Sequence, residues 1–328
     1  MRRRKFLSHS LLTASTAAIP VSRAAQLAPP GSPPPDLPQI PVIDCHTHFY
    51  DPRRPEGIPW PAKDTALYRP VLPEHLRAQP QHLPLTGTLV VEASSRLADN
   101  DWLLQLAEAD PFLVGIIGRF TGAASPLSDD FRMQVRQYAA NPLFRGIRIS
   151  SGLIRELLNR NDWAALQLLA DHNLVLDVNG GPETPGLIGA AAGKVPQLRW
   201  ILNHIGNVRI TADKPPADWQ SGIQAAARHS NVYCKVSALV EGAARDGSKA
   251  PADLAFYRPY LDVVWQAFSE ERVIYGSNWP VCERAADYRT VQRLALEDAA
   301  TRSLAALARF CHLNARTAYA WPERQPRP

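Results

Sequence analysis

The chain has 328 residues, of which 36 are Lys or Arg and 31 are Asp or Glu, giving a formal net charge of +5. Five of the basic residues and none of the acidic residues lie in residues 1–24, so the rest of the chain has balanced charge. Balanced charge argues against the broad basic surface that binding to nucleic acid or an anionic membrane requires. The composition favours a soluble protein whose partner is a small organic substrate.

Residues 1–25 have the layout of an export signal. A basic run at residues 2–5 precedes an apolar stretch at residues 11–19 and a small-residue site at Ser22-Arg23-Ala24. The apolar stretch is shorter than the roughly 20 residues that span a membrane, so no membrane insertion is expected after signal removal. The run RRKFL resembles a bacterial twin-arginine signal, with an ordinary secretory signal as the alternative. The sequence predicts a periplasmic or secreted protein.

The domain organisation follows from proline content and length. Residues 26–40 form a proline-rich linker, because proline is excluded from helix interiors and sheet ladders. Residues 41–322 form the folded domain, and residues 323–328 form a short tail. The domain is close in length to a (β/α)₈ barrel of roughly 250 residues. The four cysteines contain no CxxC pair and are expected to be buried as small hydrophobic residues.

Apolar runs rich in Val and Ile alternate with segments of helical period along this domain, which is typical of successive βα units. The predicted strands are residues 42–44, 88–92, 113–118, 146–149, 174–178, 200–203, 232–236 and 273–275. The predicted helices are residues 101–109, 129–140, 163–172, 185–192, 218–227, 254–269 and 288–309. Eight strands in alternation with helices favour a single-domain α/β fold, the (β/α)₈ TIM barrel. The proline-rich segment 49–86 is predicted to be a long loop over one end of the barrel.

Histidines are concentrated where predicted strands end. The two-residue period of a strand places Asp44, His46 and His48 on one side of the first strand, and His204 follows the sixth. Neutral imidazole is a common zinc ligand, and the HxH spacing lets both rings reach one ion. The three histidines therefore predict a metal or catalytic site. The alternative is that each histidine is a hydrogen-bonded core or surface residue.

Six segments carry a resemblance to a known family. In chain order they are VIDCHTHFYDPRRPEGIPWP (42–61), VVEASSRLADNDWLLQLA (90–107), NPLFRGIRIS (141–150), ILNHIGN (201–207), NVYCKVSAL (231–239) and VIYGSNWPVC (273–282). Together they resemble the amidohydrolase-2 branch of the metal-dependent amidohydrolases, which includes pyrone-dicarboxylate and sugar-acid lactonases and some decarboxylases. The resemblance implies a (β/α)₈ barrel, with His46, His48 and His204 at the metal or substrate position. It also implies hydrolysis of a lactone or a similar carbonyl bond.

The chain departs from the family pattern at Asn278. The pattern is Gly-Ser-Asp-Trp-Pro, in which the Asp binds metal and activates water, whereas this chain has Gly-Ser-Asn-Trp-Pro. An amide cannot take up a proton, although its oxygen can coordinate weakly or bind a water molecule. The candidate replacements for the base are Glu92, which we rank first, Asp44 and Glu241. The alternative for Glu92 is an ion pair with Arg148.

Arg148 stands where binuclear relatives place a bridging lysine, so the sequence predicts at most one divalent ion, with zinc as the expected metal. The alternative, left open by Asn278, is a site that works without metal. Arg148 and Lys235 are candidates for binding a substrate carboxylate or the carbonyl oxygen. The alternative for both is an ion pair that braces the barrel. Trp60 and Trp279 are predicted to form an apolar wall for a ring substrate, unless they are packing residues.

The function predicted from these residues is opening of a small lactone by an activated water. His46, His48 and one divalent ion hold the water, and Arg148 or His204 stabilises the oxyanion. Two alternatives stay open. One is a non-oxidative decarboxylase of the same branch, and the other is a periplasmic ligand-binding protein in which Asn278 marks lost catalysis.

Overall fold

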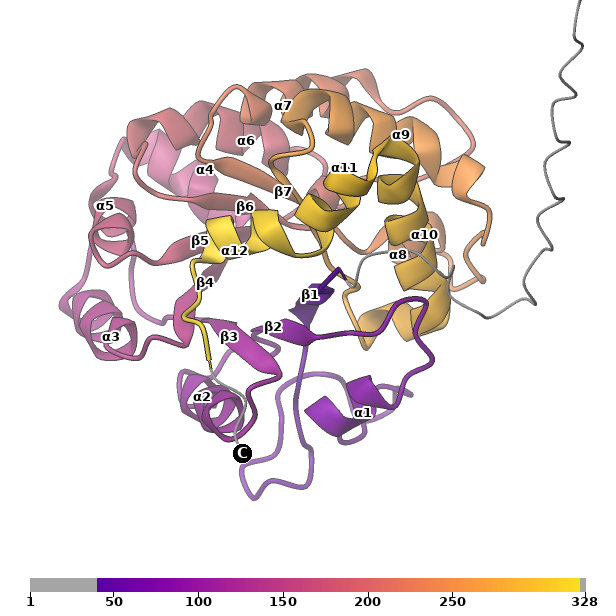
Figure 1. Cartoon of the computed structure of the whole chain (residues 1–328). Helices are drawn as coiled ribbons and strands as arrows, with labels where there is room; N and C mark the ends of the chain where they lie inside the picture. Colours follow the sequence, from indigo (N-terminus) through magenta and orange to yellow (C-terminus); the bar gives the residue numbers. More distant parts are fainter. Residues whose placement is uncertain (1–39, 325–328) are drawn as a thin grey trace, which may run out of the picture. The chain divides into compact units, whose positions relative to one another are not determined.

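Eight parallel strands follow one another around a barrel in chain order (Figure 1). The computed structural model describes residues 40–324, so the predicted signal, residues 26–39 of the linker and residues 325–328 of the tail lie outside the described residues. The strands are β1 (Ile43–Thr47), β2 (Gly87–Val91), β3 (Leu113–Gly118), β4 (Phe144–Ser150), β5 (Val175–Asn179), β6 (Trp200–Leu202), β7 (Val232–Val236) and β8 (Val273–Tyr275). Each overlaps a strand predicted from the sequence. The predicted (β/α)₈ barrel is confirmed.

The last strand returns to the first and closes the barrel. A parallel bridge joins Thr47 to Trp279. It is flanked by hydrogen bonds from the backbone N of Asn278 to the O of His46 (2.8 Å) and from the N of His48 to the O of Trp279 (2.9 Å). We call this junction, residues 46–48 with residues 278–279, the β1–β8 seam. It lies at the carboxyl ends of the strands, where barrel enzymes carry their active sites.

Helices cover the outside of the barrel (Figure 1). The longer ones are α2 (Asp99–Ala109), α3 (Asp129–Ala139), α4 (Ser151–Arg160), α5 (Ala164–Asp171), α6 (Thr184–Ala191), α7 (Ala217–Ala227), α9 (Leu254–Phe268) and α10 (Tyr288–Arg302). The shorter ones are α1 (Pro73–Arg77), α8 (Leu239–Ala243), α11 (Leu304–Ala308) and α12 (Asn314–Tyr319), with the helical turns η1 (Ala192–Lys194), η2 (Asn203–Gly206), η3 (Val281–Arg284) and η4 (Arg309–Leu313).

The seven predicted helices are present, with one change. The predicted helix 288–309 is divided, because α10 ends at Arg302 and α11 begins at Leu304. The helices α1, α8, α12 and α4 were not predicted from the sequence, and the longest of them is α4. No loop separates it from the preceding strand, since β4 ends at Ser150 and α4 begins at Ser151.

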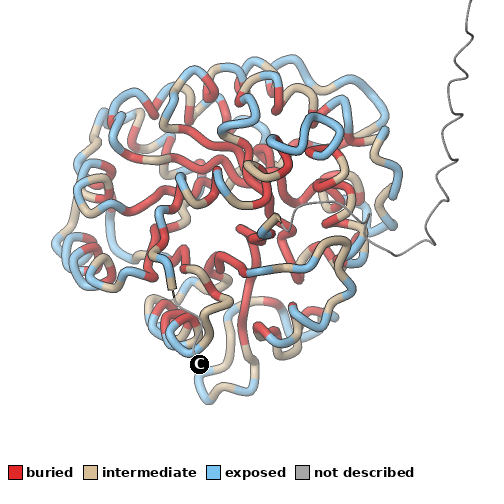
Figure 2. The backbone as a smooth tube through the Cα atoms, in the orientation of Figure 1, coloured by how far each residue is buried: buried red, intermediate tan, exposed pale blue. Residues whose placement is uncertain are grey.

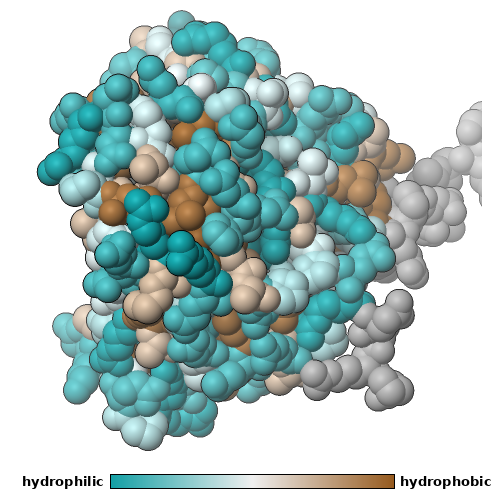
Figure 3. All heavy atoms as spheres, turned by 90° about the vertical axis from the view of Figure 1, so that its left-hand side faces the viewer, coloured by the Kyte–Doolittle hydropathy of each residue, from teal (hydrophilic) through white to brown (hydrophobic). Residues whose placement is uncertain are grey.

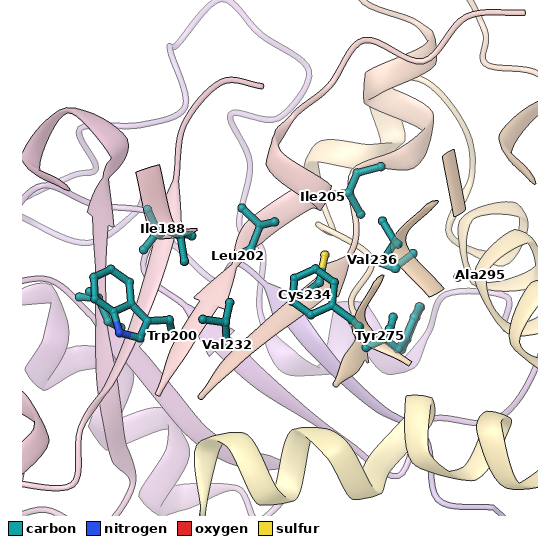
Figure 4. Close-up of a cluster of buried hydrophobic side chains, with 14 of the residues drawn as sticks. Ile188, Trp200, Leu202, Ile205, Val232, Cys234, Val236, Tyr275 and Ala295 are labelled. Carbon is teal, nitrogen blue, oxygen red and sulfur yellow. The ribbon is translucent and has the colours of Figure 1, made fainter. Parts of the chain in front are cut away.

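Side chains of each strand alternate between two apolar layers. On β6, Trp200 and Leu202 pack outward against the helices (Figure 4). Ile201, between them, belongs to the cluster inside the barrel. The inner layer is closed at the amino ends of the strands by α12, which contributes Ala318 and Tyr319. Figure 2 shows the strands as the buried centre of the domain, with exposed residues on the outer sides of the helices. The side chains at the carboxyl ends of the strands lie beyond this inner layer, and they form the candidate active site.

The segment between β1 and β2 is a long loop, as predicted, and contains only the short helix α1. A bridge between Tyr50 and Val71 ties its two arms together. The ring of Trp60 lies 5.5 Å from that of Tyr50 and 6.0 Å from that of His48, measured between centroids. The loop therefore covers the carboxyl end of the barrel beside β1.

The outer surface carries no large apolar area on the side shown in Figure 3, where hydrophilic side chains dominate and apolar ones form small patches. Within residues 40–324, no helix is both long and apolar enough to cross a bilayer. All four cysteines are buried and unpaired, which confirms their expected place in the core.

Candidate active site

Three histidines meet at the carboxyl end of the barrel. The ring centroid of His46 lies 5.1 Å from that of His48 and 4.3 Å from that of His204. His46 and His48 belong to the β1–β8 seam, and His204 follows β6. All three are buried. The structure therefore brings together the histidines that were singled out from the sequence.

A left-handed turn directs His204 into the site. His204 and Ile205 have φ values of 57° and 47°, a region that side chains with a Cβ rarely adopt. Each such residue costs roughly 1–3 kcal/mol, a cost that folded proteins tolerate mainly at functional sites. Nδ1 of His204 lies 2.8 Å from Oγ of Ser237. This contact fixes the orientation of the ring.

Lys235 lies behind His46 inside the barrel. Its Nζ is 2.8 Å from Oδ2 of Asp177 and 3.3 Å from Nδ1 of His46, and Lys235 and Asp177 are both 0% exposed. Burial, followed by the neighbouring His204 and Lys235, holds the pKa of His46 well below its usual value, so its ring is neutral. Because an ammonium can only donate, Nδ1 of His46 accepts this hydrogen bond. The proton of the ring is therefore on Nε2.

His48 has the opposite tautomer. Its Nδ1 donates to the carbonyl O of Val91 over 2.8 Å, which leaves a lone pair on Nε2. Burial, and after it the charge of Arg148, lowers the pKa of His48 to about 3, so this ring is also neutral. Nε2 of His48 faces Oδ1 of Asn278 at 3.2 Å. Both atoms are acceptors, so in this tautomer of His48 the contact is not a hydrogen bond, and Nδ2 of Asn278 points away from His48.

Asn278 connects His48 to Glu241. Nδ2 of Asn278 donates to Oε1 of Glu241 over 2.7 Å. Glu241 lies on α8, which starts directly after Ala238, a residue in the left-handed region with φ 53°. Its second oxygen, Oε2, is buried and has no hydrogen-bond partner among the described residues. Burial raises the pKa of Glu241 to about 7, so its carboxyl group can exchange a proton near neutral pH.

A pocket of about 350 Å³ opens over these groups. Its polar lining consists of His48, Arg148, Asn179, His204, Asn207, Glu241 and Asn278, and its apolar lining of Trp60, Ala93, Ala238 and Val281. Nδ2 of Asn207 donates to Oδ1 of Asn179 over 2.9 Å and to the O of Gly180 over 2.7 Å. The sequence analysis missed both asparagines. Asn179 directly follows the predicted strand 174–178, which was a signal that could have identified it, whereas Asn207 lies four residues after the predicted strand 200–203.

The model of the amidohydrolase family matches residues 43–321. The chain belongs to this family. Among curated proteins, it is 28% identical to the L-fucono-1,5-lactonase of Burkholderia ambifaria, over 75% of this chain and 82% of that one. It is also 28% identical to the L-fucono-1,5-lactonase of Burkholderia multivorans, over 80% of this chain and 90% of that one. The predicted family is confirmed, and with it an enzyme of the hydrolase class.

Solved structures agree with this fold. A zinc-bound amidohydrolase from Burkholderia multivorans is 24% identical, with a TM-score of 0.73 over 86% of this chain and 100% of that one. A probable 2-pyrone-4,6-dicarboxylic acid hydrolase from Acinetobacter baumannii, solved with citric acid, is 14% identical, with a TM-score of 0.64 over 85% and 99% of the two chains. Amidohydrolases bind metal, and one of these relatives contains zinc.

Glu92, ranked first among the candidate bases of this amidohydrolase, is held in an ion pair. Nε of Arg148 donates to its Oε1 over 3.0 Å, and Nη2 of Arg148 donates to its backbone O over 2.9 Å. Arg119 lies 3.9 Å from the same carboxylate oxygen. The structure therefore shows the ion pair that the sequence left as the alternative. Arg148 still reaches the pocket, whereas Glu92 does not line it.

Asp44 lies on the other side of β1 from the two histidines. A β-bulge between Asp44 and Thr47 shifts the register with β2, and one extra residue reverses the side to which the following side chains point. Oδ1 of Asp44 accepts from the backbone N of His46 and of Ser277, and Oδ2 accepts from the hydroxyl of Tyr288. The prediction that Asp44 shares a face with the histidines was wrong. Asp44 braces the β1–β8 seam.

The two tryptophans have different positions. Trp60 lines the pocket, as expected for an apolar wall. Trp279 is fully buried, packs 6.1 Å from the ring of Phe49 and donates from Nε1 to Glu283. It is a packing residue, so the prediction that Trp279 contacts substrate was wrong.

Lys235 is also buried in the barrel and does not line the pocket.

The donor groups of this amidohydrolase do not fit the predicted three-histidine metal centre. A histidine that binds metal offers a lone pair and donates its other N–H to a carboxylate, carbonyl or water. His48 meets this requirement through Val91. His46 does not, because its Nδ1 faces the Lys235 ammonium and its proton is on Nε2. Within residues 40–324, no group of three His, Cys, Asp or Glu side chains is placed to hold a metal ion.

Proposed function

We propose that this amidohydrolase opens a small hydroxylated lactone, with Glu241 as the base that activates water. The observation that carries the proposal is the carboxyl group of Glu241, which lines the pocket beside Asn278 and keeps one oxygen unpartnered among the described residues. Similarity to two L-fucono-1,5-lactonases supports a lactone as the substrate.

The reaction begins with a water molecule beside Oε2 of Glu241. The carboxylate takes one proton from the water, and the water oxygen forms a bond to the lactone carbonyl carbon. The carbonyl electron pair moves to the oxygen. When the carbonyl re-forms, the bond between that carbon and the ring oxygen breaks, and Glu241 returns its proton to the ring oxygen. The product is a hydroxy acid, which loses its carboxyl proton to solvent.

Arg148 and His204 stabilise the negative charge that develops on the carbonyl oxygen. Both line the pocket. Arg148 uses Nε and Nη2 for Glu92, and Nη1 has no hydrogen-bond partner among the described residues. Donors that are held in place before the reaction stabilise an oxyanion more than mobile solvent does. The ion pair with Glu92 therefore positions the arginine for the reaction.

The pocket lining supports a small polar substrate. Asn207 uses its Nδ2 on Asn179 and Gly180, which leaves its Oδ1 and the Nδ2 of Asn179 as one acceptor and one donor. Neighbouring hydroxyl groups of a sugar lactone both donate and accept, so they match this pair. Trp60 offers a flat face to the carbon side of the ring.

For a divalent ion such as zinc, we propose at most one ion per chain, weakly held. The atoms that would bind the ion are Nε2 of His48 and Oδ1 of Asn278, which lie 3.2 Å apart. Each offers a lone pair, and neither carries charge. Arg148 cannot form the bridge that a second ion requires. The steps above do not depend on the ion.

We also propose that the protein is exported by a twin-arginine signal. The proposal rests on residues 1–25, which lie outside the described residues. Replacement of Arg3 and Arg4 by Lys is expected to keep the protein in the cytoplasm.

A panel of sugar-acid lactones, each with the corresponding lactam and an aromatic carboxylic acid, tests the activity. We expect acid release from at least one lactone, no cleavage of the lactams and no carbon dioxide from the aromatic acid. Carbon dioxide release without lactone opening would instead identify a decarboxylase. Ligand binding without turnover of any lactone would support the binding-protein alternative.

A further inference from the structure

The group that contacts Nδ1 of His46 is the positively charged Lys235. The corresponding group beside a metal-binding histidine is usually a carboxylate or a carbonyl. A carboxylate or carbonyl in that position accepts the second N–H and makes the metal-binding nitrogen more basic. Here Nδ1 of His46 accepts from the Lys235 ammonium at 3.3 Å. This contact withdraws electron density from the ring and keeps the proton on Nε2.

We infer that Lys235 is a positioning residue that fixes His46 as a hydrogen-bond donor and keeps divalent metal away from the three-histidine site. Nε2 of His46 is buried and has no partner among the described residues. Its N–H is satisfied by an acceptor oxygen, such as a substrate carbonyl or a water molecule, that enters between the three rings. A cation at the same point would face a proton instead of a lone pair.

The surroundings of Lys235 hold its side chain in place. Its ammonium pairs with Asp177 at 2.8 Å, and the hydroxyl of Tyr319 donates to the same carboxylate over 3.1 Å. Nζ also lies 5.3 Å from the ring centroid of Tyr319, within range of a cation–π contact. Tyr319 belongs to α12, which closes the amino end of the barrel. The simpler explanation, an ion pair that only braces the barrel, leaves the tautomer of His46 and its affinity for metal unaffected by Lys235.

Nuclear magnetic resonance of protein with ¹⁵N-labelled histidine rings separates the two explanations. Protonated ring nitrogens and nitrogens with a lone pair give distinct signals, so each tautomer is observed directly. We expect the proton on Nε2 in His46 and on Nδ1 in His48, with signals assigned by His46→Gln and His48→Gln. A wild-type His46 ring protonated on Nδ1 would overturn the inference.

Zinc binding gives a second, independent measurement. The Asp177→Asn/Lys235→Met double variant removes the buried cation and anion together, so that no uncompensated charge remains in the core. In competition with a chromophoric chelator, we expect this variant to bind zinc at least about tenfold more tightly than wild type, the usual scale for groups behind metal ligands. Adding His46→Gln should remove the gain.

Lys249→Met is the matched control, because Lys249 is exposed and does not line the pocket. It should leave zinc affinity unchanged. Equal affinity of the wild type and the double variant would show that Lys235 does not control metal binding. Both measurements use the free protein and need no substrate. Failure of every lactone would overturn the proposed function without affecting them.

Discussion

Asn278 lies between Glu241 and His48, donating to the carboxylate over 2.7 Å and facing the imidazole Nε2 at 3.2 Å. A neutral amide thus occupies the position at which the family pattern has an acid, and the acid of this chain lies one hydrogen bond further away. Asn278 orients Glu241, whose Oε2 is buried and has no hydrogen-bond partner among the described residues.

Glu241→Gln removes the proposed base and keeps a side chain of the same shape. We expect kcat to fall by about 10²- to 10⁴-fold, the usual contribution of a positioned acid or base, with a smaller change in KM. Glu74→Gln, at an exposed position on α1, is the control and should leave kcat unchanged. Full activity of Glu241→Gln would remove Glu241 from the mechanism.

The activity should depend on the ionisation of Glu241. Only the carboxylate accepts a proton from water, and burial raises the pKa of Glu241 to about 7. kcat/KM should therefore be low in acid, rise through pH 7 and reach a plateau above it. His48 does not add a second rise in this range, because its pKa is about 3. A profile that is flat between pH 5 and 9 would contradict this assignment.

Asn278→Asp should move that profile to higher pH. A second carboxylate beside Glu241 disfavours ionisation of both, since like charges at close range raise the pKa of at least one partner. The measurement is the midpoint of kcat/KM against pH in both proteins, with metal removed. A midpoint that does not move would show that residue 278 and Glu241 do not interact in solution.

Lys235→Met alone should destabilise the protein strongly. The variant leaves the Asp177 carboxylate buried without its partner, and breaking a buried pair in this way costs about 3–5 kcal/mol. The double variant with Asp177→Asn should recover much of that loss. Chemical denaturation of the wild type, the two single variants and the double variant gives the coupling between the residues. Additive effects would indicate that the pair is not formed.

Two glycines of α6 provide a matched comparison of packing. A Cβ on Gly189 would lie 2.7 Å from Cβ of Ala225 on α7, whereas a Cβ on Gly186 would have its nearest neighbour at 4.0 Å. Gly189→Ala should therefore force α6 and α7 apart and lower stability. Gly186→Ala should stabilise the helix by up to about 1 kcal/mol. Opposite changes in the thermal unfolding midpoint would confirm that α6 and α7 are in close contact.

The barrel was predictable because strand identity depends on local composition. Runs such as LVGIIG at β3 and VYCKV at β7 are short and contain Val or Ile, and their predicted bounds match the structure. The histidines could also be located, since each follows such a run. These features require no knowledge of the contacts that a residue makes with distant parts of the chain.

The roles of individual acids could not be predicted, because they depend on local backbone geometry. A bulge in β1 turns Asp44 away from the histidines. The left-handed residue Ala238 starts α8 and brings Glu241 to Asn278, although 37 positions separate the two. Glu92 is removed from the pocket by its pairing with Arg148. The spacing of hydrophobic residues along the sequence carries no information about these three arrangements.

The β1–β8 seam joins the first strand of the barrel to the last, and the active site is built across it. The two hydrogen bonds that close the barrel come from His48 and Asn278, residues that also belong to the site. A growing polypeptide on the ribosome consequently has no working site until its eighth strand has been synthesised and has docked. The enzyme therefore becomes able to catalyse its reaction in one step, when the residues after the eighth strand close the barrel.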